Sequence, residues 1–335
     1  MSIQEVARQA GVSVATVSRV FNLPDKVSDS TREQVRQVAK SLGYLPNASA
    51  RSLRTQRSRV LGVVLPTLLN PVFAECLSGI SETAAAGGYA IQPMTTDYRL
   101  DQEERAVSAL MAGQMDGLIL VLSNPETSQA LQALGRTSLP YVLVYNRHPD
   151  HPCVSVDSER AVADLVGRLC AQGHRRISMV SGQLHASDRA QQRCRGFRQG
   201  MAAAGLVDAP VLEVPFVETA IQAIQAHLAG PRRPTALLCS NDLLAIRSLR
   251  AAHLAGLSVP QDLSITGFDG IGLGQDLTPV LSTITQPNAQ MGRCGVELLI
   301  RALADGQRLP PSASLTLSHG FRDGESCAPP PPLQP

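Results

Sequence analysis

The chain has 335 residues and is nearly neutral, with 30 Lys and Arg against 28 Asp and Glu and a formal net charge of +2. No apolar run approaches the length of a membrane span, and the first residues lack the pattern of a signal peptide, so we expect a cytoplasmic protein without a membrane partner. Its seven cysteines have no paired spacing, which in a reducing compartment is typical of free thiols.

The charge is distributed unevenly along the chain. Residues 1–59 contain ten Lys and Arg and four Asp and Glu, so this segment has a net charge of +6 and the other 276 residues have −4. A basic segment joined to a mildly acidic body is typical of a module that neutralises the phosphates of a nucleic acid.

Residues 3–22 have the pattern of a helix-turn-helix. The first helix has a buried stripe at helical spacing, formed by Ile3, Val6, Ala7 and Ala10. Gly11 permits the turn, and Ser13 can cap the second helix by accepting from its free amides. Val17 and Val20 then face the core, which leaves outside Val14, Ala15, Ser18 and Arg19. Small apolar groups suit thymine methyls, and the Arg19 guanidinium can donate twice to a guanine edge.

A helical hairpin of this kind also occurs in bundles that bind no DNA. The next residues favour the DNA-binding interpretation. They predict a third helix from about Ser30 to Leu42, with Ser28 or Ser30 as its cap and Gly43 as its end, and they continue the excess of basic residues.

A short helix is predicted from Asn47 to about Leu53, after Pro46. Two helical turns are marginal alone in water, so this segment is either a flexible linker or a helix that folds only against a partner. Arg51 and Arg54 flank Leu53, and an apolar side chain between two phosphate ligands can act as a wedge in the minor groove.

Beyond residue 58, apolar strands alternate with helices. The predicted strands are 60–65, 90–93, 117–122, 141–145, 176–181, 211–214, 236–239 and 264–268. The predicted helices are 73–86, 101–112, 158–171, 188–204, 219–228, 242–255 and about 288–305. This alternation indicates parallel sheets covered on both faces, and the body is long enough for two lobes. Such lobes bind ligands in the crevice outside the carboxyl ends of their strands.

Candidate ligand-binding side chains follow these strands. They are Phe73, Asn146, Arg147, Asn241 and Asp269, with Arg193 on the helix after Ser181. Each alone can be an ordinary surface or capping residue. Together, amide, carboxylate and guanidinium groups around an aromatic ring suit a polyhydroxylated ligand, since each hydroxyl both donates and accepts.

Over nearly its whole length the chain resembles the LacI/GalR (lactose-repressor/galactose-repressor) family of bacterial transcription regulators. The matching stretches are Val6–Asn22, Lys26–Ser28, Gly43–Asn47, Ala50–Arg54, Gly173–Ile177, Arg193–Phe197 and Ser240–Asp242. The resemblance implies a homodimer that binds a palindromic operator in double-stranded DNA, with Leu53 inserted at its centre. The residues expected at DNA are Ser13, Val14, Ala15, Thr16, Ser18, Arg19, Asn22, Tyr44, Asn47, Ala50, Arg51, Leu53 and Arg54.

For the body, the resemblance implies a periplasmic-binding-protein-like fold with the effector between its lobes. By this resemblance, Arg193 would hold the ligand and Phe216 would form an aromatic wall. Asn241 and Asp269 would contact sugar hydroxyls or purine edges. The chain would cross between the lobes near Asp157, Gln286 and Ser318.

The expected fold is therefore an all-α helix-turn-helix head plus an α/β body of two parallel-sheet lobes. The expected divisions are a DNA-binding domain at 1–45, a hinge helix and linker at 46–58, a first lobe at 59–157 with 287–317, a second lobe at 158–286 with 318–326, and a disordered tail at 327–335.

Two departures from the family concern charge. Asn146 followed by Arg147 stands where many members have an acid, and Gly270 replaces a second acid. These changes favour an anionic effector such as a sugar acid if Arg147 faces the crevice, although Arg147 could equally point to solvent.

We expect an operator-binding transcriptional regulator, a repressor, controlled by a small carbohydrate-like effector. Whether the effector acts as inducer or corepressor is open. Two alternatives are control by a partner protein and a sugar-processing enzyme; the enzyme would need a second catalytic group beside Asp269. No cofactor, catalytic residue or metal site is predicted, because His148, His151 and Cys153 fit no standard metal spacing.

Overall fold

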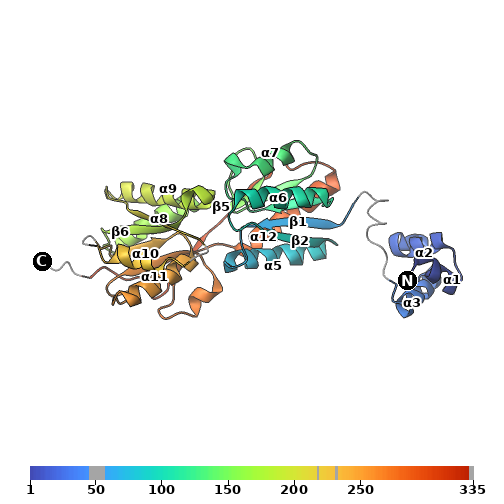
Figure 1. Ribbon diagram of the computed structural model, residues 1–335, viewed down its shortest axis with the longest axis horizontal. Helices are drawn as coiled ribbons and strands as arrows, with labels where there is room; N and C mark the ends of the chain where they lie inside the picture. Colours follow the sequence, from blue (N-terminus) through green and yellow to red (C-terminus); the bar gives the residue numbers. More distant parts are fainter. Residues whose placement is uncertain (45–56, 217–218, 231–232, 332–335) are drawn as a thin grey trace. The chain divides into compact units, whose positions relative to one another are not determined.

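The computed structural model describes residues 1–44, 57–216, 219–230 and 233–331. The chain divides into two compact units, residues 1–59 and residues 60–335 (Figure 1). Among the described residues, no helix combines the length and the apolar composition needed to cross a membrane.

The first unit is the predicted helix-turn-helix head. Its helices are α1 (Ile3–Gln9), α2 (Val14–Asn22) and α3 (Asp29–Ser41), with a single 3-10 turn at Pro24–Lys26. They enclose a small apolar core of Val6, Ala7, Ala10, Val17, Val20, Val35 and Ala39. Ser28, rather than Ser30, caps α3 by accepting from the Thr31 amide, because Ser30 already lies within the helix.

The first lobe of the second unit is built on a sheet whose neighbouring strands are all parallel. In spatial order its strands are β11 (Leu315–Leu317), β5 (Cys153–Val156), β4 (Tyr141–Val144), β3 (Gly117–Leu120), β1 (Val60–Leu65) and β2 (Ala90–Thr95). One face is covered by α5 (Pro71–Ala86) and α12 (Asn288–Asp305), and the other by α6 (Leu100–Ala112) and α7 (Gln129–Gly135) (Figure 1).

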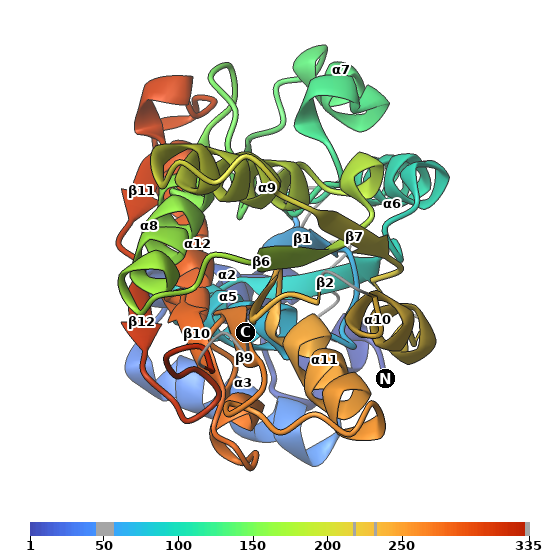
Figure 2. The same cartoon turned by 90° about the vertical axis from the view of Figure 1, so that its left-hand side faces the viewer.

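The second lobe repeats this arrangement. Its strands, in spatial order, are β12 (Gly320–Arg322), β10 (Ser282–Thr285), β9 (Ser264–Asp269), β8 (Ala236–Cys239), β6 (Ile177–Gly182) and β7 (Val211–Val214). Only β12 runs antiparallel to its neighbour among these described strands. The pair α8 (Ser158–Ala171) and α9 (Asp188–Ala203) covers one face, and the pair α10 (Ile221–Leu228) and α11 (Asp242–Leu254) covers the other (Figure 2).

The chain passes between the two sheets three times, after β5, after β10 and after β11. Helix α12 follows a strand of the second sheet yet packs on α5 and on strands of the first. These crossings place the carboxyl ends of both sets of parallel strands at the junction between the lobes, which is where α/β sheets bind ligands.

The carboxyl-terminal segment differs from the expected disordered tail. The Ala328 amide donates to Ser264 Oγ at 3.0 Å, and the Ala328 carbonyl accepts from the Ser264 hydroxyl and lies 2.9 Å from His174 Nε2. These hydrogen bonds hold Ala328 on the second lobe; residues 332–335 lie outside the described residues.

Candidate functional site

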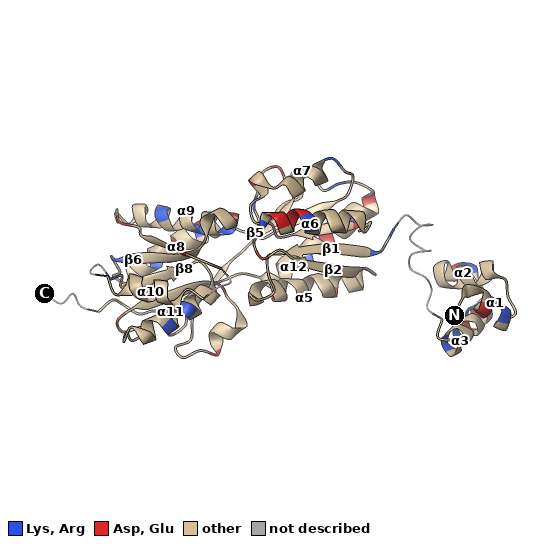
Figure 3. Ribbon diagram, in the orientation of Figure 1, with Lys and Arg blue, Asp and Glu red and all other residues tan. Residues whose placement is uncertain are grey.

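The outer face of α2 combines apolar and cationic side chains. Val14, Ala15 and Arg19 are exposed there, with 42 % of Val14 accessible, whereas Val17 and Val20 on the opposite side are buried. Figure 3 shows Lys and Arg positions, in blue, on the helices of this unit. An exposed helix face of this composition can contact base edges in a major groove.

Other predicted DNA contacts also have structural roles in the head. Ser13 accepts from the Thr16 amide at 3.1 Å and so caps α2. Asn22 donates to the Ser18 carbonyl at 2.7 Å in the last turn of this helix. Tyr44 packs its ring on Phe21, with 6.0 Å between ring centroids. Outside the described residues lie Asn47, Ala50, Arg51, Leu53 and Arg54.

A cavity lies at the carboxyl ends of the two sheets in the second unit. Both lobes contribute to its wall: Asn70, Val72, Phe73, Tyr98 and Tyr145 come from the first, and Ser187, Arg189, Ala190, Arg193, Phe216, Ser240, Asn241 and Asp269 come from the second. Its free volume is about 30 Å³. That is room for little more than a water molecule, so a larger ligand requires the walls to move apart.

Five predicted effector residues line this cavity, namely Phe73, Arg193, Phe216, Asn241 and Asp269. Asn241 also caps α11, because its side-chain oxygen accepts from the Leu244 amide at 2.8 Å.

Asn146 and Arg147, by contrast, do not line the cavity. Asn146 is fully buried and exchanges hydrogen bonds with the Leu122 amide and carbonyl. The Arg147 side chain is 51 % exposed and pairs with Asp157 at 3.0 Å. The Asn146 side chain points into the protein interior and the Arg147 side chain points toward Asp157, so neither lies in the wall of this cavity.

The sequence interpretation missed polar lining residues that also follow strands. These are Asn70, Tyr98, Tyr145, Ser187 and Arg189. They lie in segments that follow strands, as the predicted candidates do, and this place in the chain could have identified them. For Tyr98 the backbone adds a further indication, because Asp97 and Tyr98 both have left-handed φ values, 49° and 59°. Such conformations are costly for residues other than glycine and occur often at ligand sites.

Arg193 and Asp269 form the charged centre of the cavity. Their side chains approach to 3.3 Å, and the Arg193 guanidinium lies over the Phe268 ring, 3.7 Å from its centroid. Burial raises the pKa of Asp269 from its ordinary value, and Arg193 opposes this shift. Burial also lowers the pKa of Arg193. Burial therefore disfavours both charges, while the attraction between Arg193 and Asp269 favours them.

Direct contacts join the two lobes beside the cavity. Asn146 donates to Asp188 at 2.8 Å, and Arg189 Nη1 donates to the Leu122 carbonyl at 2.7 Å. The rings of Tyr98 and Phe216 stack at 4.5 Å with an interplanar angle of 10°. Any separation of the lobes must exchange these contacts for others.

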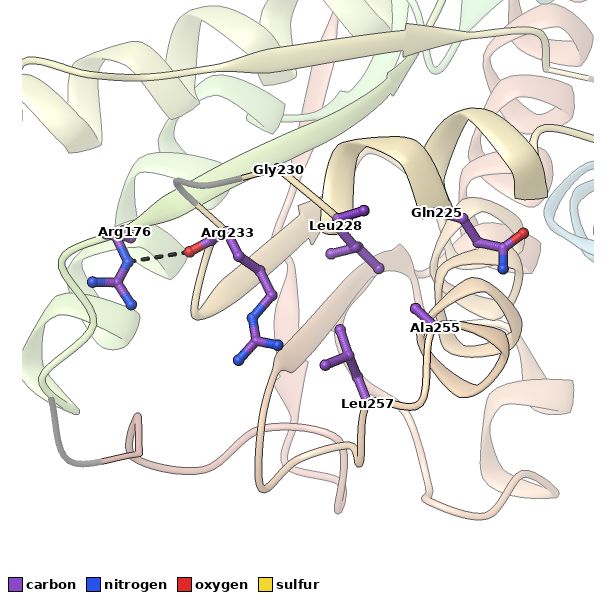
Figure 4. A pocket seen from close by; sticks show the side chains of 8 residues that line it. Arg176, Gln225, Leu228, Gly230, Arg233, Ala255 and Leu257 are labelled. Carbon is purple, nitrogen blue, oxygen red and sulfur yellow. Dashed lines mark hydrogen bonds between the residues drawn. The ribbon is translucent and has the colours of Figure 1, made fainter. Parts of the chain in front are cut away.

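A second, open groove lies on the second lobe (Figure 4). Its volume is about 770 Å³, and its lining residues are Arg176, Gln225, Leu228, Ala229, Gly230, Arg233, Ala255 and Leu257. Arg176 Nε donates to the Arg233 carbonyl at 3.1 Å. Arg176 precedes β6, so this groove lies at the amino ends of the strands, opposite to the edge that carries the cavity.

No group of three or more His, Cys, Asp or Glu side chains that could hold a metal ion occurs in the described part of the chain. His148 lies 3.0 Å from Glu126, and His151 lies 2.7 Å from the Tyr141 hydroxyl. These contacts connect the histidines to neighbouring side chains of the first lobe.

Comparison with known proteins gives two family matches. Residues 2–47 match bacterial regulatory proteins of the lacI family, and residues 166–327 match a periplasmic binding protein-like domain. The HTH-type transcriptional repressor CytR of Escherichia coli is 34 % identical over 305 residues, which cover 89 % of each chain.

Two solved structures are similar to this chain over nearly its whole length. The lac repressor dimer bound to operator and the anti-inducer ONPF has a TM-score of 0.86 and 24 % identity, covering 98 % of this chain and 99 % of that one. A complex of the transcriptional regulator CelR with cellobiose has a TM-score of 0.71 and 26 % identity, with 97 % and 99 % covered.

Proposed function

This chain belongs to the lacI family of bacterial regulatory proteins. From that premise we propose that it binds a palindromic operator as a homodimer. A small molecule bound between the lobes would raise or lower its affinity for that operator. Membership makes it a DNA-binding transcriptional repressor and not an enzyme. The dimer, the effector and the individual contact residues belong to the proposal.

The observation that carries the proposal is a cavity whose wall is shared between the two lobes. Phe73 and Tyr98 approach it from one side, and Arg193, Phe216 and Asp269 from the other. A ligand that contacts both walls binds with different affinity when the lobes change their spacing. Differential affinity of this kind is the physical requirement for an allosteric effector.

The small free volume supports the same conclusion. At about 30 Å³ the cavity does not admit a monosaccharide, so a carbohydrate-like effector must displace contacts such as the Tyr98–Phe216 stack. A coupling of about 1–3 kcal/mol between ligand and DNA is typical of allosteric proteins. The related structure of CelR with cellobiose supports a small carbohydrate as the class of ligand.

For DNA, the exposure of Val14, Ala15 and Arg19 supports base contacts by α2. One such helix covers half of an operator, and two copies related by a two-fold axis would read a palindrome whose half-sites lie one helical turn apart. Changes in the body would reach the head through residues 46–58.

The experiment is selection of bound duplexes from a random DNA pool by the purified full-length protein, near physiological salt, with no added metabolite. We expect a palindrome with a central CG step. Recovery of unrelated sequences would show that the protein alone is not the operator-binding form, and the proposal of a repressor released by its effector would then be wrong.

A further inference from the structure

Two arginines in the cavity wall have unused hydrogen-bond donors. Arg189 and Arg193 are both buried, with side chains 7 % and 8 % exposed. Arg189 Nη2 and Arg193 Nε are buried nitrogens without a hydrogen-bond partner among the residues that the structure describes. A buried N–H group without an acceptor costs free energy, and such orphaned groups in a native protein call for a partner.

Other nitrogens of these guanidinium groups donate to neighbouring residues. Arg189 Nη1 donates to the Leu122 carbonyl and to Asp188. Arg193 donates to the Ser240 carbonyl through Nη1 and to Asp269 through Nη2. Both side chains are therefore held in place, and the two nitrogens without partners belong to residues of the cavity wall.

The carboxylates beside the cavity already accept hydrogen bonds at both oxygens. Asp188 accepts from Asn146 and Arg189 at Oδ1 and from Gln192 at Oδ2. Asp269 accepts from Gln286 at 2.8 Å and from Arg193 at Oδ1, and it accepts from Asn70 at Oδ2. The cavity wall thus contains guanidinium nitrogens with no acceptor at all, whereas every oxygen of these two carboxylates already has at least one donor.

This inventory discriminates between ligand classes. A neutral sugar hydroxyl brings a hydrogen as well as lone pairs, so each one needs an acceptor as well as a donor. An ionised carboxylate or a phosphate brings acceptors only, and its hydrogen bonds to arginine are about twice as strong as neutral ones. The two guanidinium groups lie beside two carboxylates, so the preference comes from free donors and not from a net positive charge.

We propose that the effector carries a carboxylate or phosphate group and that Arg189 is the residue that selects it. The inference rests on the proposed function, in that the cavity is taken as the effector site. It also gives Arg189 the role that the sequence suggested for Arg147, whose half-exposed guanidinium pairs with Asp157 outside the cavity.

The test compares probes that differ in charge but not in shape. Acetate and its neutral isostere acetamide are titrated into the full-length protein at constant ionic strength, set with chloride, and inorganic phosphate forms a third arm. The readouts are the thermal midpoint and the dissociation constant from calorimetry. The variants are Arg189→Gln, Arg189→Lys and the matched control Arg147→Gln, with circular dichroism to verify folding.

We expect acetate or phosphate, but not acetamide, to raise the thermal midpoint of the wild type. Arg189→Gln should weaken that binding at least tenfold, Arg189→Lys should retain part of it, and Arg147→Gln should leave it unchanged. A larger response to acetate than to phosphate identifies a carboxylate ligand, and the reverse identifies a phosphate.

Three results overturn the inference: equal responses to acetate and acetamide, no response to either anion, or a response that survives in Arg189→Gln. Operator binding distinguishes these from failure of the proposed function. A neutral metabolite that occupies the cavity and shifts operator affinity would leave the proposed function standing and remove the anionic group. Anion binding at Arg189 by a protein whose operator affinity no crevice ligand changes would do the opposite.

Discussion

Asn146, at the carboxyl end of β4, donates a hydrogen bond of 2.8 Å to Asp188, the first residue of α9 in the other lobe. Asn146 is fully buried, and its amide also donates to the Leu122 carbonyl at 2.9 Å and accepts from the Leu122 amide at 2.8 Å. All the donors of this side chain are therefore used in joining β3, β4 and α9, which explains why it does not face the cavity.

The substitution Asn146→Ala should destabilise the body. It leaves the buried Leu122 amide without its side-chain partner, while the Leu122 carbonyl keeps the hydrogen bond from Arg189. A buried polar group that loses its partner costs about 1–3 kcal/mol. Urea unfolding of the full-length protein measures the change. The neighbouring variant Arg147→Ala is the control, since an exposed ion pair contributes about 0–1 kcal/mol. Equal losses in the two variants would contradict the bridging role of Asn146.

The substitution Arg193→Ala should remove the effector response while sparing DNA binding. Arg193 lines the cavity, whereas the DNA-binding residues belong to the separate unit of residues 1–59. Operator affinity is measured by fluorescence anisotropy with and without the small molecule that shifts the wild-type affinity. A response that persists in the variant would place the effector elsewhere.

Gly270 is required by its conformation, and Gly270→Ala should destabilise the second lobe. Its φ is +75°, and a Cβ here would lie 2.8 Å from Thr285 Cα. Strain of this kind costs about 1–3 kcal/mol, before any displacement of β10. Gly272→Ala is the matched control, because nothing lies within 4 Å of a Cβ built there. Thermal unfolding of the two variants should differ clearly; similar midpoints would contradict the prediction.

Ionisation of Asp242 should lower the unfolding free energy of the body as the pH rises. Burial raises its pKa from 3.8 to about 7, although Thr283 and the Ile271 amide donate to it. Because the folded-state pKa lies above the unfolded one, the stabilising contribution is complete below about pH 4 and is lost as the pH rises through about 7.

The measurement is the unfolding free energy of wild type and Asp242→Asn between pH 4 and pH 8. Each pKa unit of difference is equivalent to about 1.4 kcal/mol. The wild type should lose stability relative to the variant across this interval. In addition to burial, repulsion by Asp269 raises the pKa of Asp242, so the difference between the two curves reports Asp242 together with its coupling to Asp269. A constant difference would show that Asp242 does not titrate there.

Local patterns predicted much of this fold. The helical spacing of Val6, Ala7 and Ala10, and the cap at Ser13, are properties of a few neighbouring residues, and α1 and α2 form where these predict. The alternation of apolar strands and helices likewise predicted two lobes with ligands at the carboxyl ends. Asp269, at the end of a strand, and Arg193, on the helix after another, were predicted from these places in the chain and from the resemblance to the family, and the cavity contains both.

What the sequence by itself determined was which segments form helices and strands and which loops lie at the crevice, because periodicity, caps and turn residues act over short distances. Only the tertiary structure decided the direction of each loop side chain. Asn146 turns to Asp188, Arg147 turns to Asp157, and Arg189 lies in the cavity wall with one nitrogen that has no hydrogen-bond partner among the described residues. These directions depend on hydrogen-bond partners supplied by other elements once the lobes have packed, and no local pattern contains them.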